Sequence, residues 1–169
     1  MGAANTPVIV RVRLMNAALT EPAPVRIAGK PWGSPRYSIH CRPIGETREL
    51  CDAIDAAVFR RWPEGPPAQL RHPLRLNDAG TWFHAGAPGD EPPELYHLAG
   101  GEVLPGLGSP HTLKGAEALV SVEVQAYQPM PWASGCDILL RAVCIVEAGA
   151  QTGAAASFTA ALRGIPNAA

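Results

Sequence analysis

Two alternating segments decide the fold of this chain, Glu117-Ala-Leu-Val-Ser-Val-Glu-Val-Gln-Ala-Tyr127 and Asp137-Ile-Leu-Leu-Arg-Ala-Val-Cys-Ile-Val146. In the first, the even positions from 118 to 126 are all Ala or Val, and the odd positions from Leu119 to Tyr127 are mostly polar. A period of two over this length is typical of a strand with one face in a core and the other in water. The segments flank Gln128-Pro-Met-Pro-Trp-Ala-Ser-Gly135 and predict a hairpin of a small β-barrel.

The composition is that of one globular domain. Of 169 residues, 47% are apolar and 17% are charged, which is enough to bury a core without disulfides. The 17 glycines and 18 prolines gather between the periodic segments and predict long connections. We expect a flexible N-terminus over residues 1–6, one domain over 7–150, and a weakly ordered tail over 151–169 that includes a short helix near Ala154 to Leu162.

Two N-terminal strands carry basic residues on their wet faces. The alternation from Val8 to Leu14 puts Arg11 and Arg13 outside, and that from Tyr37 to Arg42 puts His40 and Arg42 outside. Residues 15 to 36 lie between them and are expected to form a long connection. Eleven of the fourteen Lys and Arg residues precede residue 85, so a local basic surface is expected although the net charge is −1.

One helix and several short strands complete the predicted elements. Glu46 to Trp62 has apolar residues at helical spacing, acidic residues at its start and basic residues at its end, which predicts a helix. Leu74 to Leu76, Thr81 to His84 and Leu95 to Leu98 are candidate short strands. The prediction is therefore a mainly β fold with one main helix.

The sequence contains no motif that carries catalysis. It has no P-loop, G-x-G-x-x-G, G-x-S-x-G or H-E-x-x-H pattern, and its histidines are scattered. Its four cysteines form no C-x-x-C pair and are expected to be buried thiols in a reducing cytoplasm. We expect no enzyme activity, no cofactor, no metal and, because no apolar run reaches about 18 residues, no membrane contact.

Basic and aromatic side chains interleave on the outer strand faces and in the loops. Single-stranded nucleic acid is bound by this mixture, with cations along the phosphates and flat rings against the bases. Each tryptophan has the alternative of packing under a loop. The candidate nucleic-acid-binding residues are Arg11, Arg13, Lys30, Trp32, Arg36, His40, Arg42, Trp82, Tyr127 and Trp132.

Several loose motifs follow one another in a characteristic order. They are Gly33-Ser-Pro-Arg-Tyr-Ser-Ile-His-Cys-Arg-Pro43, the helix over 46 to 62, Leu74-Arg-Leu-Asn-Asp78, Pro93-Glu-Leu-Tyr96, and the strands 115 to 127 and 136 to 146. Over about residues 7 to 150, this order resembles the T7-type single-stranded DNA-binding proteins of phages and prophages. The resemblance implies a five-stranded OB-fold-like barrel with long loops that binds single-stranded DNA across its face.

The resemblance also implies a cytoplasmic protein of replication or recombination, which protects or anneals single strands and contacts replication or recombination proteins. Family members carry an acidic C-terminal run, whereas residues 147 to 169 contain only Glu147 and Arg163 as charged residues. The neutral net charge and this difference leave a second hypothesis open, a phage structural or adaptor protein that uses the barrel for protein contact. The oligomeric state also stays open, with a homodimer as one option.

Overall fold

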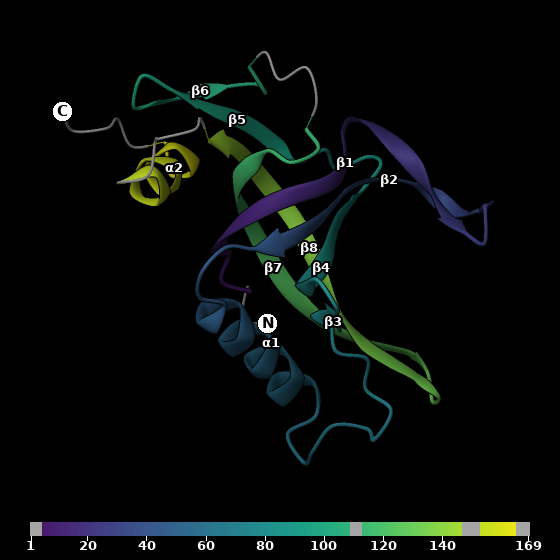
Figure 1. The fold of residues 1–169 in the computed structure, drawn as a ribbon. Helices are drawn as coiled ribbons and strands as arrows, with labels where there is room; N and C mark the ends of the chain where they lie inside the picture. The colour runs from purple at the N-terminus through teal and green to yellow at the C-terminus, as the bar shows by residue number, and fades with distance from the viewer. Residues whose placement is uncertain (1–4, 109–112, 147–152, 165–169) are drawn as a thin grey trace.

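Five strands close into a barrel in the computed structural model, which describes residues 5–108, 113–146 and 153–164 (Figure 1). Their order is β4-β2-β1-β7-β8, and a parallel β4–β8 pairing closes the ring. These strands are β1 (Val8–Ile27), β2 (Lys30–Pro43), β4 (Gly80–Pro88), β7 (Glu117–Met130) and β8 (Ala133–Val146). The predicted OB-fold-like barrel is confirmed.

The remaining elements extend this barrel. Strand β3 (Arg75–Asn77) pairs with β4, and β5 (Glu94–Ala99) pairs with the end of β8 and with β6 (Glu102–Pro105). Helix α1 (Arg48–Arg61) packs mainly against β7. A second helix, α2 (Ala154–Leu162), occupies the place where the sequence predicts a short helix. No helix among the described residues has the length and hydropathy needed to cross a membrane.

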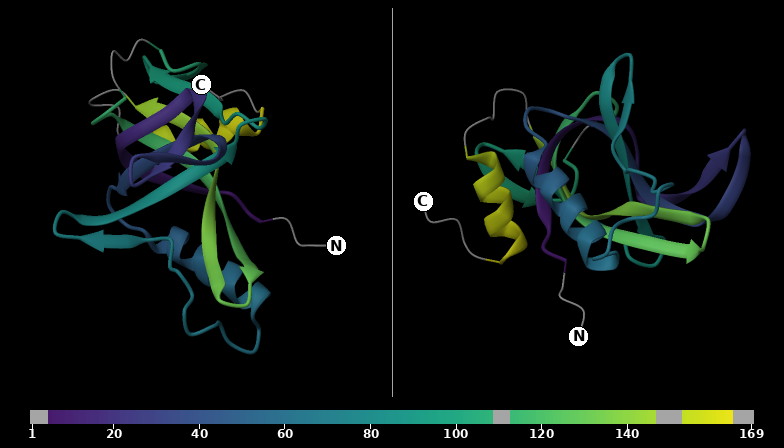
Figure 2. Two further views of the ribbon diagram at one scale, coloured as in Figure 1. Left: turned by 90° about the vertical axis from the view of Figure 1, so that its right-hand side faces the viewer. Right: turned by 90° about the horizontal axis from the view of Figure 1, so that it is seen from below.

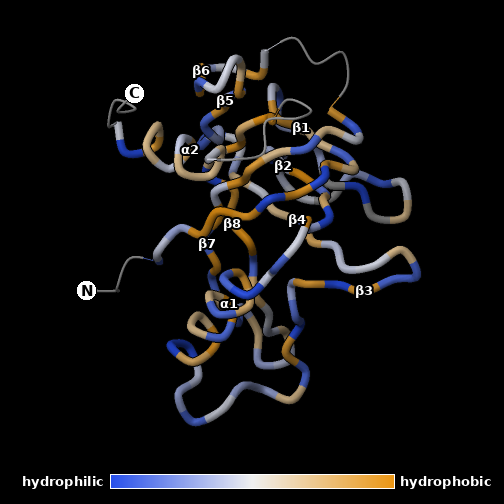
Figure 3. The backbone as a smooth tube through the Cα atoms, turned by 60° about the vertical axis from the view of Figure 1, so that its left-hand side comes forward, coloured by the Kyte–Doolittle hydropathy of each residue, from blue (hydrophilic) through white to orange (hydrophobic). Residues whose placement is uncertain are grey.

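The core follows the alternation of the strands. Val12, Leu14, Ile39 and Cys41 are fully buried, and Figure 3 shows apolar residues concentrated along the strands that form the barrel. Helix α1 adds Leu50, Ile54 and Ala57 to the same cluster, as the helical spacing predicts. Phe83 from β4 and Phe158 from α2 are the largest fully buried side chains among the described residues, and Phe83 belongs to the barrel core.

Two long hairpins replace connections that the sequence left irregular. The expectation of a loop over residues 15 to 36 was wrong, because β1 continues to Ile27 and β2 begins at Lys30. Ala28 and Gly29 join them, with φ of 50° and 77°, and positive φ at both positions matches the twist of a tight hairpin. Likewise β7 and β8 continue until only residues 131–132 separate them. Both hairpins project from the barrel as arms (Figure 2).

Helix α2 covers part of the sheet that was expected to face water. Leu119 and Ser121 are 5% and 2% exposed, so the prediction of a wet outer face was wrong at these two positions of β7. Leu119 packs in a second apolar cluster with Phe158 of α2, which is fully buried. In Figures 1 and 2 this helix lies on the side of the barrel away from the two arms. With α2 on that side, the outer faces of β2, β3 and β4 are not covered by a helix.

Candidate nucleic-acid interface

Strands β2, β3 and β4 present basic and aromatic side chains on one outer face. The register pairs His40 with His84 across β2 and β4, and Arg75 with Trp82 across β3 and β4. Directly paired residues of antiparallel strands lie on the same face of the sheet. The sequence alternation therefore becomes a continuous surface over three strands, which we call the basic face. Its members are Arg36, His40, Arg42, Arg75, Trp82 and His84.

The basic face borders a cavity of about 230 Å³ at the base of the β7–β8 arm. An isolated backbone bridge between Arg71 and Gly135 brings the segment before β3 to this arm. Side chains from four parts of the chain thus meet here. The lining residues are Arg36, Arg71, His72, Pro73, Arg75, Trp82, His84, Gly86, Tyr127, Cys136, Asp137 and Ile138.

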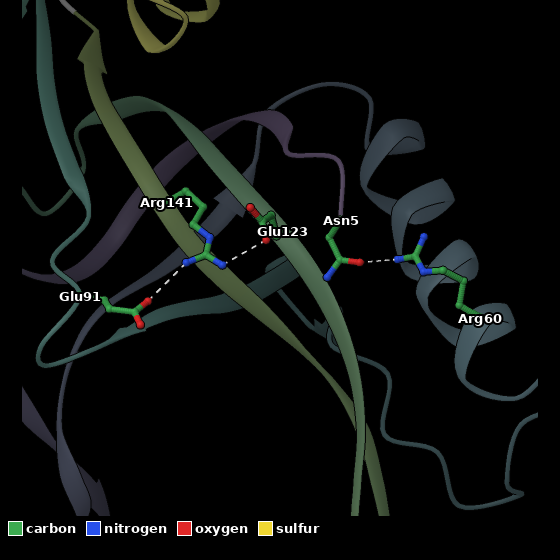
Figure 4. A network of polar contacts seen from close by, with 5 residues as sticks. All are labelled: Asn5, Arg60, Glu91, Glu123 and Arg141. Atoms are coloured by element: carbon green, nitrogen blue, oxygen red, sulfur yellow. Dashed lines mark hydrogen bonds and ion pairs between the residues drawn. The ribbon is translucent and has the colours of Figure 1, made fainter. Parts of the chain in front are cut away.

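The arginines of the cavity differ from Arg11 and Arg141, which are ion-paired with carboxylates. Among the described residues, Arg36, Arg71 and Arg75 make no ion pair with a carboxylate. Elsewhere, Arg141 binds Glu123 at 3.1 Å and Glu91 at 3.6 Å, and Arg60 donates to Asn5 at 2.6 Å (Figure 4). Three arginines and one carboxylate, Asp137, line the cavity, so it carries a local excess of positive charge on a chain whose net charge is −1.

Two aromatic rings stand beside these charges. Trp82 contacts the His40 ring edge-to-face, with 4.5 Å between the ring centroids. Tyr127 lies against the backbone of Gly135, where a Cβ atom would come within 2.7 Å of the phenolic oxygen. Glycine at this position thus allows the Tyr127 ring to approach β8 closely. Both rings line the cavity, so a base has two surfaces against which it can stack.

Three buried nitrogens of the basic face lack a hydrogen-bond partner within the described residues. They belong to Arg36 (Nε), His40 (Nε2) and Arg42 (Nη1). Buried polar groups are normally paired, and an unpaired one costs about 1–3 kcal/mol. Three of the four such side-chain atoms among the described residues thus belong to the basic face, where a polar ligand would find unpaired polar atoms.

The histidines of the basic face are biased toward the neutral form. Desolvation lowers the pKa of His40 below its usual 6.5, and the Arg42 guanidinium adds to this effect. The His84 side chain is partly accessible to solvent, yet desolvation by its surroundings lowers its pKa. The positive charges of His40 and Arg36 lower this pKa further, whereas the carboxylate of Asp137 raises it. Both rings are therefore neutral at pH 7 and titrate below 6.5.

We expect two opposite effects as the pH falls from 7 to 5.5. Because His40 and His84 take up protons more readily in the unfolded chain, the free energy of unfolding falls once the pH drops below 6.5. An approaching phosphate favours the protonated rings, so affinity for an anionic strand rises over the same range. Urea titrations and fluorescence anisotropy measure the two effects. The His40→Gln/His84→Gln variant should lose both slopes, and slopes equal to those of the wild type would refute this role.

The structure separates the two arginines of β1. Arg11 forms an ion pair with Glu117 and lines a different cavity, between β1, α1 and α2. Arg13 is exposed and pairs with Arg42 across β1 and β2, with its guanidinium donating to the Gly115 carbonyl at 2.9 Å. Arg13 thus extends the basic face, whereas the charge of Arg11 is neutralised outside it.

Three predicted residues lie on the arms. Lys30 is exposed and follows the turn of the β1–β2 arm. Trp32 pairs with Val25 on the same arm, and its side chain lies outside the described part. Trp132 is 71% exposed at the tip of the β7–β8 arm. Neither Lys30 nor Trp132 lines the cavity.

Sequence reasoning missed four members of the site, namely Arg71, His72, Arg75 and His84. A signal was present for two of them. The candidate strands at Leu74 to Leu76 and Thr81 to His84 flank Asn77-Asp-Ala-Gly80, which is typical of a short hairpin. Counting back from this turn puts Arg75 opposite Trp82, as the structure shows. The cavity position of Arg71 and His72 has no comparable sequence signal, because it depends on the long-range bridge to Gly135.

The fold is shared with single-stranded DNA-binding proteins of bacteriophages. The C-terminally truncated protein from bacteriophage Enc34 matches with a TM-score of 0.60 and 14% identity, over 87% of this chain and 97% of that chain. The Enc34 protein in complex with single-stranded DNA gives a TM-score of 0.54 and 18% identity, over 80% and 82% of the two chains. Gp2.5, a single-stranded DNA-binding protein of bacteriophage T7, gives 0.55 and 17%, over 91% and 97%. No protein-family model and no curated protein matches the sequence.

Proposed function

We propose that this protein binds single-stranded DNA through the basic face and the adjoining cavity. The observation that carries the proposal is the meeting of unneutralised Arg36, Arg71 and Arg75 with Trp82 and Tyr127 in one cavity. A flexible single strand exposes its bases for stacking, whereas a duplex keeps them inside. The shared fold of phage proteins named as single-stranded DNA-binding supports the same proposal.

The chemistry of binding follows from the side chains. Guanidinium groups of Arg36, Arg71 and Arg75 hold successive phosphates, and Trp82 and Tyr127 stack on bases between them. With Arg42 as a fourth phosphate contact, the logarithm of affinity should fall against the logarithm of salt concentration with a slope of about −3. The interaction is therefore expected to be salt-sensitive and independent of any catalytic group.

A salt titration with a fluorescent dT oligonucleotide tests the proposal. We expect anisotropy to report binding at low salt, loss of binding near physiological salt, and poor competition by duplex DNA of the same length. Absence of binding at low salt, or equal competition by duplex and single-stranded DNA, would exclude the proposed function.

Replacing Trp82 by Ala should weaken binding to dT by about tenfold, because stacking of one base contributes about 1–3 kcal/mol. The slope of the salt dependence should stay unchanged, since no phosphate contact is lost. Phe59→Ala is the matched control, since Phe59 is a 67% exposed aromatic on α1 and lines none of the cavities described above. Equal affinity of the Trp82 variant and the wild type would argue against base stacking at this position.

The biological setting is a further part of the proposal. Protection or annealing of strands in phage or prophage replication or recombination, in the cytoplasm and together with replication or recombination proteins, fits this binding mode. The adaptor alternative is not favoured, because the basic and aromatic character of the cavity suits a nucleic acid. Whether the protein acts as a homodimer is a question for sedimentation analysis with and without DNA.

A further inference from the structure

One acidic side chain interrupts the basic cavity. Asp137 lines it together with Arg36, Arg71 and Arg75. The parallel pairing of Ala85 with Ile138 puts the preceding residues, His84 and Asp137, next to each other on the outer face of β4 and β8. A carboxylate at this place repels the phosphates that the arginines attract, so electrostatic binding of the backbone does not explain it.

Asp137 has no hydrogen-bond or ion-pair partner within the described residues, although its charge raises the pKa of neighbouring His84. Its side chain is exposed. The two acidic residues of the neighbouring strand β7 differ, because Glu117 binds Arg11 and Glu123 binds Arg141. The carboxylate of Asp137 is therefore available to a ligand that enters the cavity.

The rest of the cavity suits a single base. Its volume of about 230 Å³ and its two rings, Trp82 and Tyr127, offer space and stacking surfaces. An ionised carboxylate only accepts hydrogen bonds, so it selects a base edge that donates. Guanine is the one DNA base whose Watson–Crick edge presents two adjacent donors, its ring N1–H and its 2-amino group. Adenine and cytosine put a ring acceptor beside one amino group, and thymine puts a carbonyl on each side of its N–H.

We propose that Asp137 makes this cavity a guanine-selective subsite within the single-stranded DNA interface. The two carboxylate oxygens accept hydrogen bonds from guanine N1–H and N2–H while Trp82 and Tyr127 hold the ring. This inference rests on the proposed function and adds base selectivity to it. The arginines supply affinity for any sequence, and Asp137 supplies the preference.

Anisotropy with alternating 12-mers of dT-dG, dT-dA, dT-dC and dT-dI, together with all-dT, tests the subsite. We expect wild-type protein to bind dT-dG about tenfold more tightly than all-dT, which is the size of effect given by one good bidentate contact. Hypoxanthine, the base in dT-dI, differs from guanine only by the missing 2-amino group. The tenfold preference over all-dT should therefore fall to about threefold or less for dT-dI. Equal affinity for dT-dG and dT-dI would overturn the bidentate contact.

The Asp137→Asn variant separates selectivity from charge. It is expected to bind dT-dG and all-dT within twofold of each other and to bind all-dT more tightly than the wild type does. Asp55→Asn removes the same charge from an exposed position on α1 that lines none of the cavities described above, and it should keep the tenfold preference. A preference for dT-dG that survives in Asp137→Asn would overturn the subsite. Failure of every oligonucleotide to bind would instead remove the proposed function, and the subsite with it.

Discussion

Reversing Arg71 and Arg75 to Glu together is expected to weaken binding to single-stranded DNA by about 100-fold at low salt. Each lost phosphate contact costs about a factor of ten and lowers the magnitude of the salt slope by about 0.7. Both side chains are exposed, and both line the cavity without an ion pair among the described residues. The measurement is anisotropy with a dT oligonucleotide at several salt concentrations, with circular dichroism to confirm the fold.

The matched control changes the same charge at another place. Arg48→Glu/Arg61→Glu alters two exposed arginines of α1, neither of which lines the basic cavity. The two double variants have the same net charge, so long-range attraction is lowered equally in both. Comparable losses of affinity in the two variants would show that overall charge, rather than the basic face, governs binding.

The Phe83→Ala variant is expected to lose about 3–5 kcal/mol of unfolding free energy, the range measured for large aromatic side chains removed from well-packed cores. Phe83 is fully buried in the barrel cluster, and it lies between Trp82 and His84, which both face the site. Because small domains are stable by about 5–15 kcal/mol, a large part of the fold's stability depends on this ring. Urea denaturation measures the change.

Phe59 provides the contrasting case on α1. It is 67% exposed, so Phe59→Ala should change the free energy of unfolding by less than about 0.5 kcal/mol. DNA binding by folded Phe83→Ala protein should be retained at low temperature, since the basic side chains remain. A Phe83 variant as stable as the wild type would contradict the assignment of this ring to the barrel core.

The sequence predicted the barrel because its evidence is local. Alternation from Val8 to Leu14 and from Glu117 to Tyr127 is a property of each strand alone, and it fixed which side chains enter the core. Proline and glycine between residues 15 and 36 obscured the β1–β2 arm, which accommodates them at bulges and at the Ala28–Gly29 turn. The covering of Leu119 by α2 joins residues far apart in the chain, and no local pattern encodes it.

The candidate site was predictable to the extent that it follows strand alternation. His40, Arg42 and Trp82 share the basic face because their strands are neighbours. Arg11 and Arg13 occupy equivalent outward positions in the sequence alternation, yet Glu117 neutralises Arg11 while Arg13 stays exposed. Glu117 lies directly opposite Arg13 in the register and nevertheless pairs diagonally with Arg11, so neither the sequence nor the strand register alone predicts which arginine is neutralised.

The parallel seam between β4 and β8 has a mechanical consequence. Only two residue pairs, Ala85 with Ile138 and Gly86 with Leu139, close the ring. His84 and Asp137 lie on either side of this seam, so a ligand in the cavity spans the strand pairing that has the fewest paired residues in the barrel. Under the proposed function, we expect DNA bound in the cavity to contact both strands and so to stabilise the closed barrel.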